Sequence, residues 1–307
     1  MWHTRTLADG EALFEEGEAT GTLAQVVSGT VRLVRGGQFL ARVGPDGWLG
    51  EATAFVEDGR HFATARAEGP VVLRLLRRTE LRSLRQAADP DYLELLIQAL
   101  RAIVERIESV NAAVLSKVAG GAPPAAEPGR LARLWARVTE AGGRAPDALP
   151  VVETLPALTR ADATQVARSG RSRFVPTSQA LVVEGDLGPG MFLVLSGALR
   201  VVRSRPDGTV TELALAGPGA LLGTHSTLRN QPRGATLVAG EPTWVLELTL
   251  DSLPRAVRPA FAECLAAVLG AQLAAADVQL MALSGGHPHL DPELGRVALG
   301  LVEASRL

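Results

Sequence analysis

The chain has 307 residues, 47% hydrophobic and 21% charged, and at about 150 residues per domain this length favours two folded domains. Its 31 basic residues are balanced by 33 acidic residues, so it lacks the basic excess that drives non-specific binding to nucleic acids. A single cysteine, Cys264, excludes an intrachain disulfide, and we find neither a signal peptide nor an apolar run approaching a membrane span. We expect a cytoplasmic protein that binds neither nucleic acid nor membrane.

An internal repeat becomes visible when the two halves of the chain are compared. Residues 13–35 read LFEEGEATGTLAQVVSGTVRLVR, and residues 181–203 read LVVEGDLGPGMFLVLSGALRVVR. The two segments align without a gap, and the match resumes further on, where Leu49-Gly50 aligns with Leu222-Gly223. A repeat of this length predicts one domain that has been duplicated.

Each copy contains short apolar runs between glycine-containing turns, such as Ala24–Val27 and Val31–Val34. This pattern is typical of the short strands of a sandwich or barrel. The pairs Ser28-Gly29 and Ser196-Gly197 lie between such runs and predict hairpin turns. With about eight strands per copy, the expected fold class is mainly β with α: two jelly-roll β-rolls, each followed by helices.

A helix is predicted after each roll. The first of these helices begins at Pro90. Its apolar residues are spaced alternately three and four positions apart, the heptad spacing that places one stripe against a partner helix. The stripe consists of Leu93, Leu96, Leu100, Ile103, Ile107, Val110 and Val114. It could pack on its own roll, but its regular spacing favours a helix–helix interface. The second helix, Ala260–Leu283, is alanine-rich, so we favour a homodimer through residues 90–117 over the alternative, pairing within one chain.

The predicted organisation has four segments. Residues 1–117 form the first roll and its long helix, and residues 118–154 form a linker with a short helix. Residues 155–284 form the second roll with its helices, and residues 285–307 form a tail with a short helix. The linker begins with VAGGAPPAAEPG, a composition typical of linkers, and the tail is too short for a winged helix.

Both copies resemble the cyclic-nucleotide-binding domain of the catabolite activator protein, protein kinase A regulatory subunits and gated channels. The second copy is the fuller match, with a helix over 159–168, then Val183-Glu184-Gly185-Asp186 and Leu195-Ser196-Gly197. The first copy begins at its first strand and lacks the preceding helix. The resemblance covers about residues 5–117 and 155–283, and it implies tandem β-rolls without a DNA-binding domain.

The resemblance also implies a phosphate-binding cassette, in which Gly-Glu opens a short helix and a loop leads to Arg, a small residue, Ala and Thr. Amides at the helix start and the arginine would bind the cyclic phosphate, and the Glu would accept from the ribose 2′-hydroxyl. The second copy keeps Arg233, Gly234 and Ala235, but Gly223 is followed by Thr224 in place of Glu. A threonine hydroxyl can still bond to the ribose, so this copy is the better candidate for binding.

The first copy keeps the other half of the cassette. Gly50 and Glu51 are present, but His61 stands where arginine is expected and Phe62 where a small residue is expected. Arg60 lies one residue early and could substitute only if the loop shifted. An unperturbed imidazole is mostly neutral near pH 7 and is a poor substitute for a guanidinium, so we expect a degenerate pocket.

These patterns favour a non-catalytic regulatory protein that senses a cyclic nucleotide, cAMP or cGMP, in its second domain and relays it to an unidentified protein partner. The alternative is a ligand-independent interaction or scaffold module with degenerate pockets. An enzyme is not expected, because a cupin-type metal site needs clustered histidines, whereas those of this chain are scattered. They are His3, His61, His225, His287 and His289. We predict no catalytic residue and no metal site.

Overall fold

The computed structural model describes residues 2–56, 58–118, 144–204 and 210–284. The chain divides into two compact units. Unit 1 contains residues 1–119 and 262–296, and unit 2 contains residues 120–261 and 297–307. The sequence boundaries assigned the last long helix to the second domain, whereas the structure groups all but its first turn with unit 1.

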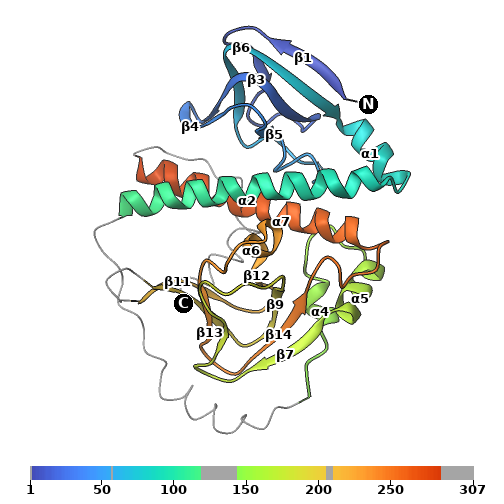
Figure 1. Cartoon of the computed structure of the whole chain (residues 1–307), viewed down its shortest axis with the longest axis vertical. Helices are drawn as coiled ribbons and strands as arrows, with labels where there is room; N and C mark the ends of the chain where they lie inside the picture. The colour runs from blue at the N-terminus through green and yellow to red at the C-terminus, as the bar shows by residue number, and fades with distance from the viewer. Residues whose placement is uncertain (1, 57, 119–143, 205–209, 285–307) are drawn as a thin grey trace. The chain divides into compact units, whose positions relative to one another are not determined.

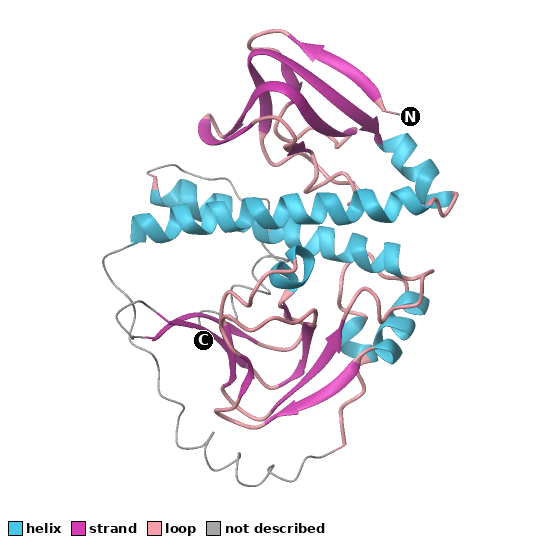
Figure 2. Cartoon of the chain, viewed as in Figure 1, coloured by secondary structure: helices cyan, strands magenta, loops and turns pink. Residues whose placement is uncertain are grey.

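The first roll is an antiparallel sheet in unit 1 with the order β1-β6-β3-β4, in which β2 also pairs with β6 and β5 with β3 (Figure 2). Two 14-residue strands, β3 (Thr22–Arg35) and β6 (Thr64–Arg77), form its centre. The shorter strands are β1 (His3–Leu7), β2 (Ala12–Phe14), β4 (Gln38–Val43) and β5 (Trp48–Leu49). Alternate residues of the long strands point inward and form an apolar core that includes Val31, Leu33 and Leu73.

The second roll, in unit 2, has two four-stranded sheets with the orders β11-β10-β13-β8 and β12-β9-β14-β7. Its first sheet contains β8 (Ala180–Val182), β10 (Leu199–Ser204), β11 (Val210–Ala216) and β13 (Thr236–Ala239). Its second sheet contains β7 (Arg171–Val175), β9 (Met191–Ser196), β12 (Leu221–Leu222) and β14 (Thr243–Leu248). Facing side chains of the two sheets, among them Val194, Leu199 and Val245, form the core.

The predicted helix before the second roll is confirmed as α5 (Arg160–Ser169), which α4 (Leu149–Val152) precedes. Thr159 caps α5, since its hydroxyl accepts from the backbone N–H of Asp162 and the Asp162 carboxylate accepts from the N–H of Thr159. The short helices predicted within the linker and the tail lie outside the described residues. Helix α4 lies in the last, described part of the linker.

The hairpins predicted at the Ser-Gly pairs are wrong. Ser28-Gly29 lies inside β3, where the register with β6 shifts on both sides of Ser28, so the pair marks a bulge in a continuous strand. At Ser196-Gly197 the chain leaves β9 and enters β10, and these strands belong to different sheets. A glycine next to a serine allows either a bend or a tight turn, and strand pairing elsewhere decides between them.

The long helix predicted after the first roll is confirmed as α2 (Pro90–Val118), which follows α1 (Arg78–Gln86). Except for half-buried Leu93, the residues of its heptad stripe are buried. Helix α7 (Arg258–Leu283) lies beside α2 (Figure 1), and a hydrogen bond of 2.6 Å joins Tyr92 of α2 to Glu263 of α7. The stripe is therefore buried within one chain, which is the alternative that the sequence left open, and a homodimer through residues 90–117 remains a prediction.

Helix α7 departs from the expectation that no apolar segment is long enough to cross a membrane. By length and composition it passes that test, with a mean hydropathy of 1.5 in its most apolar window. Within the fold, 67% of that window is buried, and Cys264 is among its fully buried residues. A core helix that is covered on several sides has the same composition.

Candidate functional site

The backbone places His61 and Arg233 at equivalent positions of the two rolls. In the first roll, His61 donates its N–H to the Glu18 carbonyl and accepts from the Gly17 N–H, both at 2.9 Å. In the second roll, Arg233 makes the same pair of bonds with residues 185–186, both at 2.8 Å. The alignment that set a histidine against the expected arginine is therefore reproduced in three dimensions.

A glycine in the left-handed region opens both cassettes, Gly50 with φ 78° and Gly223 with φ 77°. Neither position has room for a side chain. A Cβ at Gly50 would lie 2.6 Å from the Thr22 carbonyl oxygen, and one at Gly223 would lie 2.5 Å from Nη1 of Arg233. The conformation and the close approach both require glycine, so the two rolls keep the same turn.

In the second roll, Arg233 is only 5% exposed and its guanidinium bonds to the start of the cassette. Nη1 donates to Oγ of Ser226 at 2.8 Å and to the Gly223 carbonyl at 3.2 Å, and Nη2 donates to the Gly190 carbonyl at 2.7 Å. The guanidinium also lies over the Phe192 ring, 5.3 Å from its centre. These contacts hold the side chain in one orientation, with neutral groups as its hydrogen-bond acceptors.

Burial lowers the pKa of Arg233, while the nearby carboxylates of Glu247 and Asp186 raise it. A guanidinium stays charged in proteins, so the second roll contains a buried cation. None of the described residues forms an ion pair with it at salt-bridge distance. Such a cation is stabilised when an anion that accepts paired N–H bonds comes within reach.

The other predicted residues of the second site lie around this arginine. Helix α6 (Thr224–Arg229) starts directly after Gly223, and Thr224, in the position of the expected glutamate, is buried. Gly234 is exposed and Ala235 is half-buried, and both precede β13. The predicted residues therefore occur at the two ends of one loop, which the Arg233 side chain closes.

In the first roll, the His61 side chain is buried against an aromatic ring. It is 5% exposed, and its ring stacks on Phe14 with 3.5 Å between the centres and 2° between the planes. Burial lowers the pKa of His61 to about 4, against a smaller opposite effect from Glu18, so the ring is neutral at pH 7. Arg60 does not replace the arginine, because it is exposed, bonds to the Gly17 carbonyl at 2.8 Å and is not among the residues that line the pocket.

Glu51, expected to bind a ribose, is engaged within the protein. It is 1% exposed, and Oε1 accepts a hydrogen bond of 3.0 Å from Nη1 of Arg106 on α2. The cavity beside it, also lined by His61, Leu273 and Asp277, has a volume of about 30 Å³. Small-molecule sites usually measure about 300–1,000 Å³, whereas this cavity has room for one or two water molecules. The first cassette is closed by the side chains around it.

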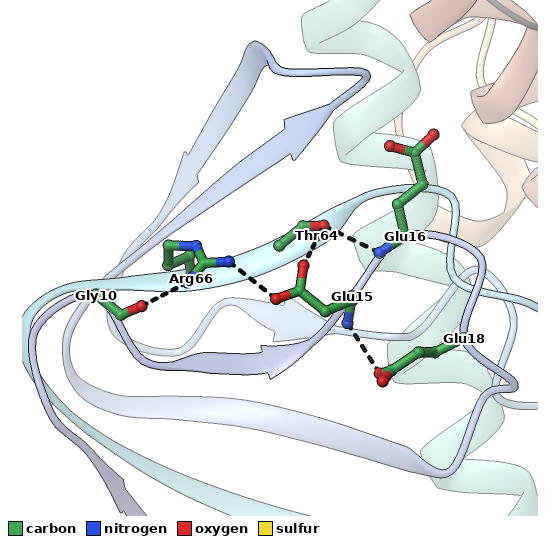
Figure 3. A network of polar contacts seen from close by, with 6 residues as sticks. All are labelled: Gly10, Glu15, Glu16, Glu18, Thr64 and Arg66. Carbon is green, nitrogen blue, oxygen red and sulfur yellow. Dashed lines mark hydrogen bonds and ion pairs between the residues drawn. The ribbon is translucent and has the colours of Figure 1, made fainter.

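The far end of the first cassette is fixed by a polar network (Figure 3). Oγ1 of Thr64 accepts from the Glu16 N–H at 3.0 Å and donates to Oε2 of Glu15 at 2.8 Å. Arg66 bonds to the other oxygen of Glu15 at 2.9 Å. In the second roll, the one contact of this kind that Thr236 makes with a described residue is the first, since it accepts from the Glu184 N–H at 2.9 Å.

Sequence reasoning did not identify Phe14, Arg106, Leu273 and Asp277, which close the first pocket, or Ser226, which anchors Arg233. One signal was available, since Asp277 is an isolated acid in an apolar helix. No group of three or more metal-binding side chains occurs in the part of the chain that the structure describes. The histidine pair at 287 and 289 lies outside that part.

Two β-rolls, each with a glycine-led turn and a loop that ends at a buried side chain, define a tandem β-roll protein. A model of the cyclic nucleotide-binding domain matches residues 4–88 and 172–258, together more than half of the chain. The chain therefore belongs to the cyclic nucleotide-binding domain family, as the sequence motifs indicated.

Among known proteins, the chain is similar to the cyclic AMP receptor protein of Thermus thermophilus, with 36% identity over 136 residues. The match covers 44% of this chain and 61% of that protein, so it spans about three fifths of the relative. The cAMP-bound regulatory domain of protein kinase A from Toxoplasma gondii matches over 81% of this chain and 78% of that one, with 17% identity and a TM-score of 0.31. A cyclic nucleotide-binding domain from Methylobacillus flagellatus matches over 38% and 71%, with 23% identity and a TM-score of 0.34.

Proposed function

We propose that the chain is a non-catalytic cytoplasmic regulator that binds a cyclic nucleotide, cAMP or cGMP, in its second roll and relays occupancy to a partner protein. The observation that carries this proposal is the buried, oriented guanidinium of Arg233 behind the Gly223 turn. A cyclic phosphate is a compact anion with oxygens that accept paired N–H bonds, so it supplies the charge that the neutral partners of Arg233 do not.

The rest of the second cassette supports the same ligand class. The hydroxyl of Thr224 replaces the usual carboxylate as a partner for the ribose, which predicts weaker binding than in a cassette with glutamate. The relative from Thermus thermophilus is described as a cyclic AMP receptor protein. Because the first pocket is closed by Glu51, Arg106 and the His61–Phe14 stack, we expect one ligand per chain.

Calorimetric titration of the full chain with cAMP and with cGMP tests the proposal. We expect one site per chain, and we expect Arg233→Ala to weaken binding by about 100-fold, as expected when a buried charged partner is lost. Arg60→Ala is the matched control, because it removes an exposed arginine from the other cassette and leaves binding unchanged. Arg233→Lys, which keeps the charge and loses the paired donors, distinguishes a binding defect from a folding defect. An absence of binding at millimolar ligand, or binding that Arg233→Ala does not weaken, would overturn the proposal.

A second candidate function, a ligand-independent interaction module, is favoured by the closed first pocket. There the cassette residue Glu51 bonds to Arg106 of the protein itself. This function predicts a partner whose affinity is the same with and without nucleotide and with Arg233→Ala. A partner whose affinity changes with nucleotide, and only while Arg233 is present, would contradict it.

A further inference from the structure

One face of α7 lies against the first roll. Residues 270, 273, 274 and 277 have the i, i+3, i+4, i+7 spacing of a single helix face, and each of them contacts the roll or lines its cavity. A Cβ at Gly270 would lie 2.5 Å from the carbonyl oxygen of Ala52, in the turn of the first cassette. Four residues further on, the Ala274 carbonyl accepts a hydrogen bond of 3.3 Å from Arg35. The backbone of α7 at Gly270 therefore lies so close to the cassette turn that a side chain at this position has no room.

The remaining two residues of this face, Leu273 and Asp277, line the small cavity of the first cassette. Three buried atoms on its lining residues have no hydrogen-bond partner among the described residues: Oε2 of Glu51, Nε of Arg106 and Oδ1 of Asp277. Two of these atoms accept and one donates. A single water molecule donates two bonds and accepts one or two, and the cavity of about 30 Å³ has room for it.

We propose that α7 is the resident ligand of the first roll, in which Asp277 occupies the cassette and a bridging water joins it to Glu51 and Arg106. The first cassette is then a docking site for a helix of the same chain, in place of a nucleotide site. This inference concerns unit 1 alone and is independent of whether the second roll binds a nucleotide.

The charges around Asp277 fit this role. Arg106 and Arg35 favour its ionised form, Glu51 opposes it, and burial raises the pKa of Asp277. A buried carboxyl group in an apolar helix is costly unless it is hydrogen-bonded, so its position opposite two arginines gives the helix one preferred register on the roll.

A second buried acid fixes the same helix 14 residues earlier, about 21 Å along the helix axis. Glu263 accepts from the Tyr92 hydroxyl at 2.6 Å and pairs with Arg85 at 2.8 Å. Phe55, which follows the cassette turn, meets the Tyr92 ring edge-on with 6.0 Å between the centres. The helix is thus held at two separated points, one on each side of Gly270.

Hydrogen exchange of the full chain, followed by mass spectrometry over residues 50–56, tests the docking of α7. Replacing glycine by alanine inside a helix normally stabilises it. Here we expect the opposite for Gly270→Ala, with exchange over residues 50–56 about tenfold faster, because the new methyl group forces α7 away from Ala52. Gln279→Ala, at an exposed position of the same helix, is the control and leaves this exchange unchanged.

Two substitutions at Asp277 test the polar contact separately. Asp277→Leu removes every donor and acceptor and is expected to speed exchange over 50–56 like Gly270→Ala, whereas Asp277→Asn keeps an acceptor and has a smaller effect. The proposal is supported when the change is confined to residues 50–56, α2 and α7. It is overturned when Gly270→Ala and Asp277→Leu both leave residues 50–56 as protected as in the parent chain, or when protection is lost equally in both rolls.

Discussion

The two cassettes share a glycine turn and a pair of backbone hydrogen bonds, and they differ in the side chain that these bonds hold in place. Behind the same left-handed glycine, the second roll places Arg233 and the first places His61, each with the same two backbone hydrogen bonds. The arginine rests on neutral acceptors and keeps a charge that nothing within salt-bridge distance among the described residues neutralises. The histidine is neutral and stacked on Phe14, so it offers no charge for an anionic ligand to neutralise. A duplicated fold thus preserves the position of a binding group, while the side chain decides whether a ligand is needed.

The two rolls also differ at the position of the cassette glutamate. Glu51 remains where the cassette motif has it, but its partner is Arg106 of α2. In the second roll, the equivalent position is Thr224, which carries no charge. The roll that kept its acid has therefore lost the phosphate-binding arginine, and the roll that kept the arginine has lost its acid. Among the described residues, Glu51 has an ion-pair partner at salt-bridge distance and Arg233 has none.

The largest effect is expected when the second cassette is made like the first. Arg233→His removes three hydrogen bonds to Gly190, Gly223 and Ser226 and leaves their buried oxygens without this donor. We expect a loss of about 4 kcal/mol in the free energy of unfolding of the second roll. Urea denaturation measures it, followed by the fluorescence of Trp244 of β14 in a chain whose other three tryptophans are replaced by phenylalanine.

The control for this exchange is Arg160→His, at an exposed arginine that pairs with Glu153 at 3.2 Å. Exposed pairs contribute little, so we expect a change within about 0.5 kcal/mol. If Arg233→His costs no more than Arg160→His, then the guanidinium is not a structural part of the second cassette, and the contrast between the two rolls fails.

The second effect is a pH dependence that only the first cassette should show. The pKa of His61 is about 4 in the fold and 6.5 in its unperturbed state, so the unfolded chain binds more protons between these values. The contribution of His61 to stability is therefore highest above pH 6.5 and falls as the pH drops from 6.5 to 4, by about 3 kcal/mol in total.

Replacing the ring by one that cannot titrate isolates this contribution. His61→Phe keeps an aromatic ring against Phe14, and we expect the stability of the first roll to lose its slope between pH 6.5 and 4. Denaturation at a series of pH values, with intact chain as reference, measures the difference. The raised pKa of Asp277 acts with the opposite sign, since its contribution falls as the pH rises, and it remains in this variant. An unchanged slope in His61→Phe would assign the titration to another group.

The sequence predicted what local spacing and internal comparison determine. The duplication followed from matched glycine pairs, and helix α2 followed from an unbroken heptad stripe beginning after Pro90. The positions of Arg233 and His61 followed from the alignment of the two loops, which the backbone hydrogen bonds reproduce. Each of these features depends on residues that are close together in the chain or equivalent in the two copies.

The features that the sequence did not predict depend on contacts between distant segments. Arg106 and Asp277 are 171 positions apart, and only the packing of α7 beside α2 brings them to the cavity at Glu51. The pair Ser28-Gly29 predicts a hairpin but forms a bulge, because hairpins and bulges use the same residues and differ in which strands pair. A heptad stripe likewise predicts a partner helix without saying which helix, and its spacing alone did not favour α7.

The smallest expected effect is a difference in stability between variants of the two threonines that end the cassettes. Thr64 makes two hydrogen bonds, with the Glu16 N–H and the Glu15 carboxylate, whereas Thr236 makes one, with the Glu184 N–H. Valine keeps the branched shape and removes the hydroxyl. At about 1 kcal/mol per hydrogen bond, we expect Thr64→Val to cost about 2 kcal/mol and Thr236→Val about 1 kcal/mol. Urea denaturation of both variants gives the two costs, when Thr64→Val is studied in a chain that keeps only Trp48 of the four tryptophans and Thr236→Val in one that keeps only Trp244.

The order of these two costs matters more than their size. It tests whether the first cassette, which is closed, is also fixed more tightly at this end than the second. In the first roll, Thr64 belongs to a network that continues through Glu15 to Arg66 and the Gly10 carbonyl (Figure 3), so its loss also releases the Glu15 carboxylate. Glu15→Gln, which keeps the shape and removes the charge, should reduce the extra cost of Thr64→Val if the network is the cause. Equal costs for the two valine variants would mean that the exposed carboxylate adds nothing, and that the two rolls are fixed at this end by the same single backbone contact.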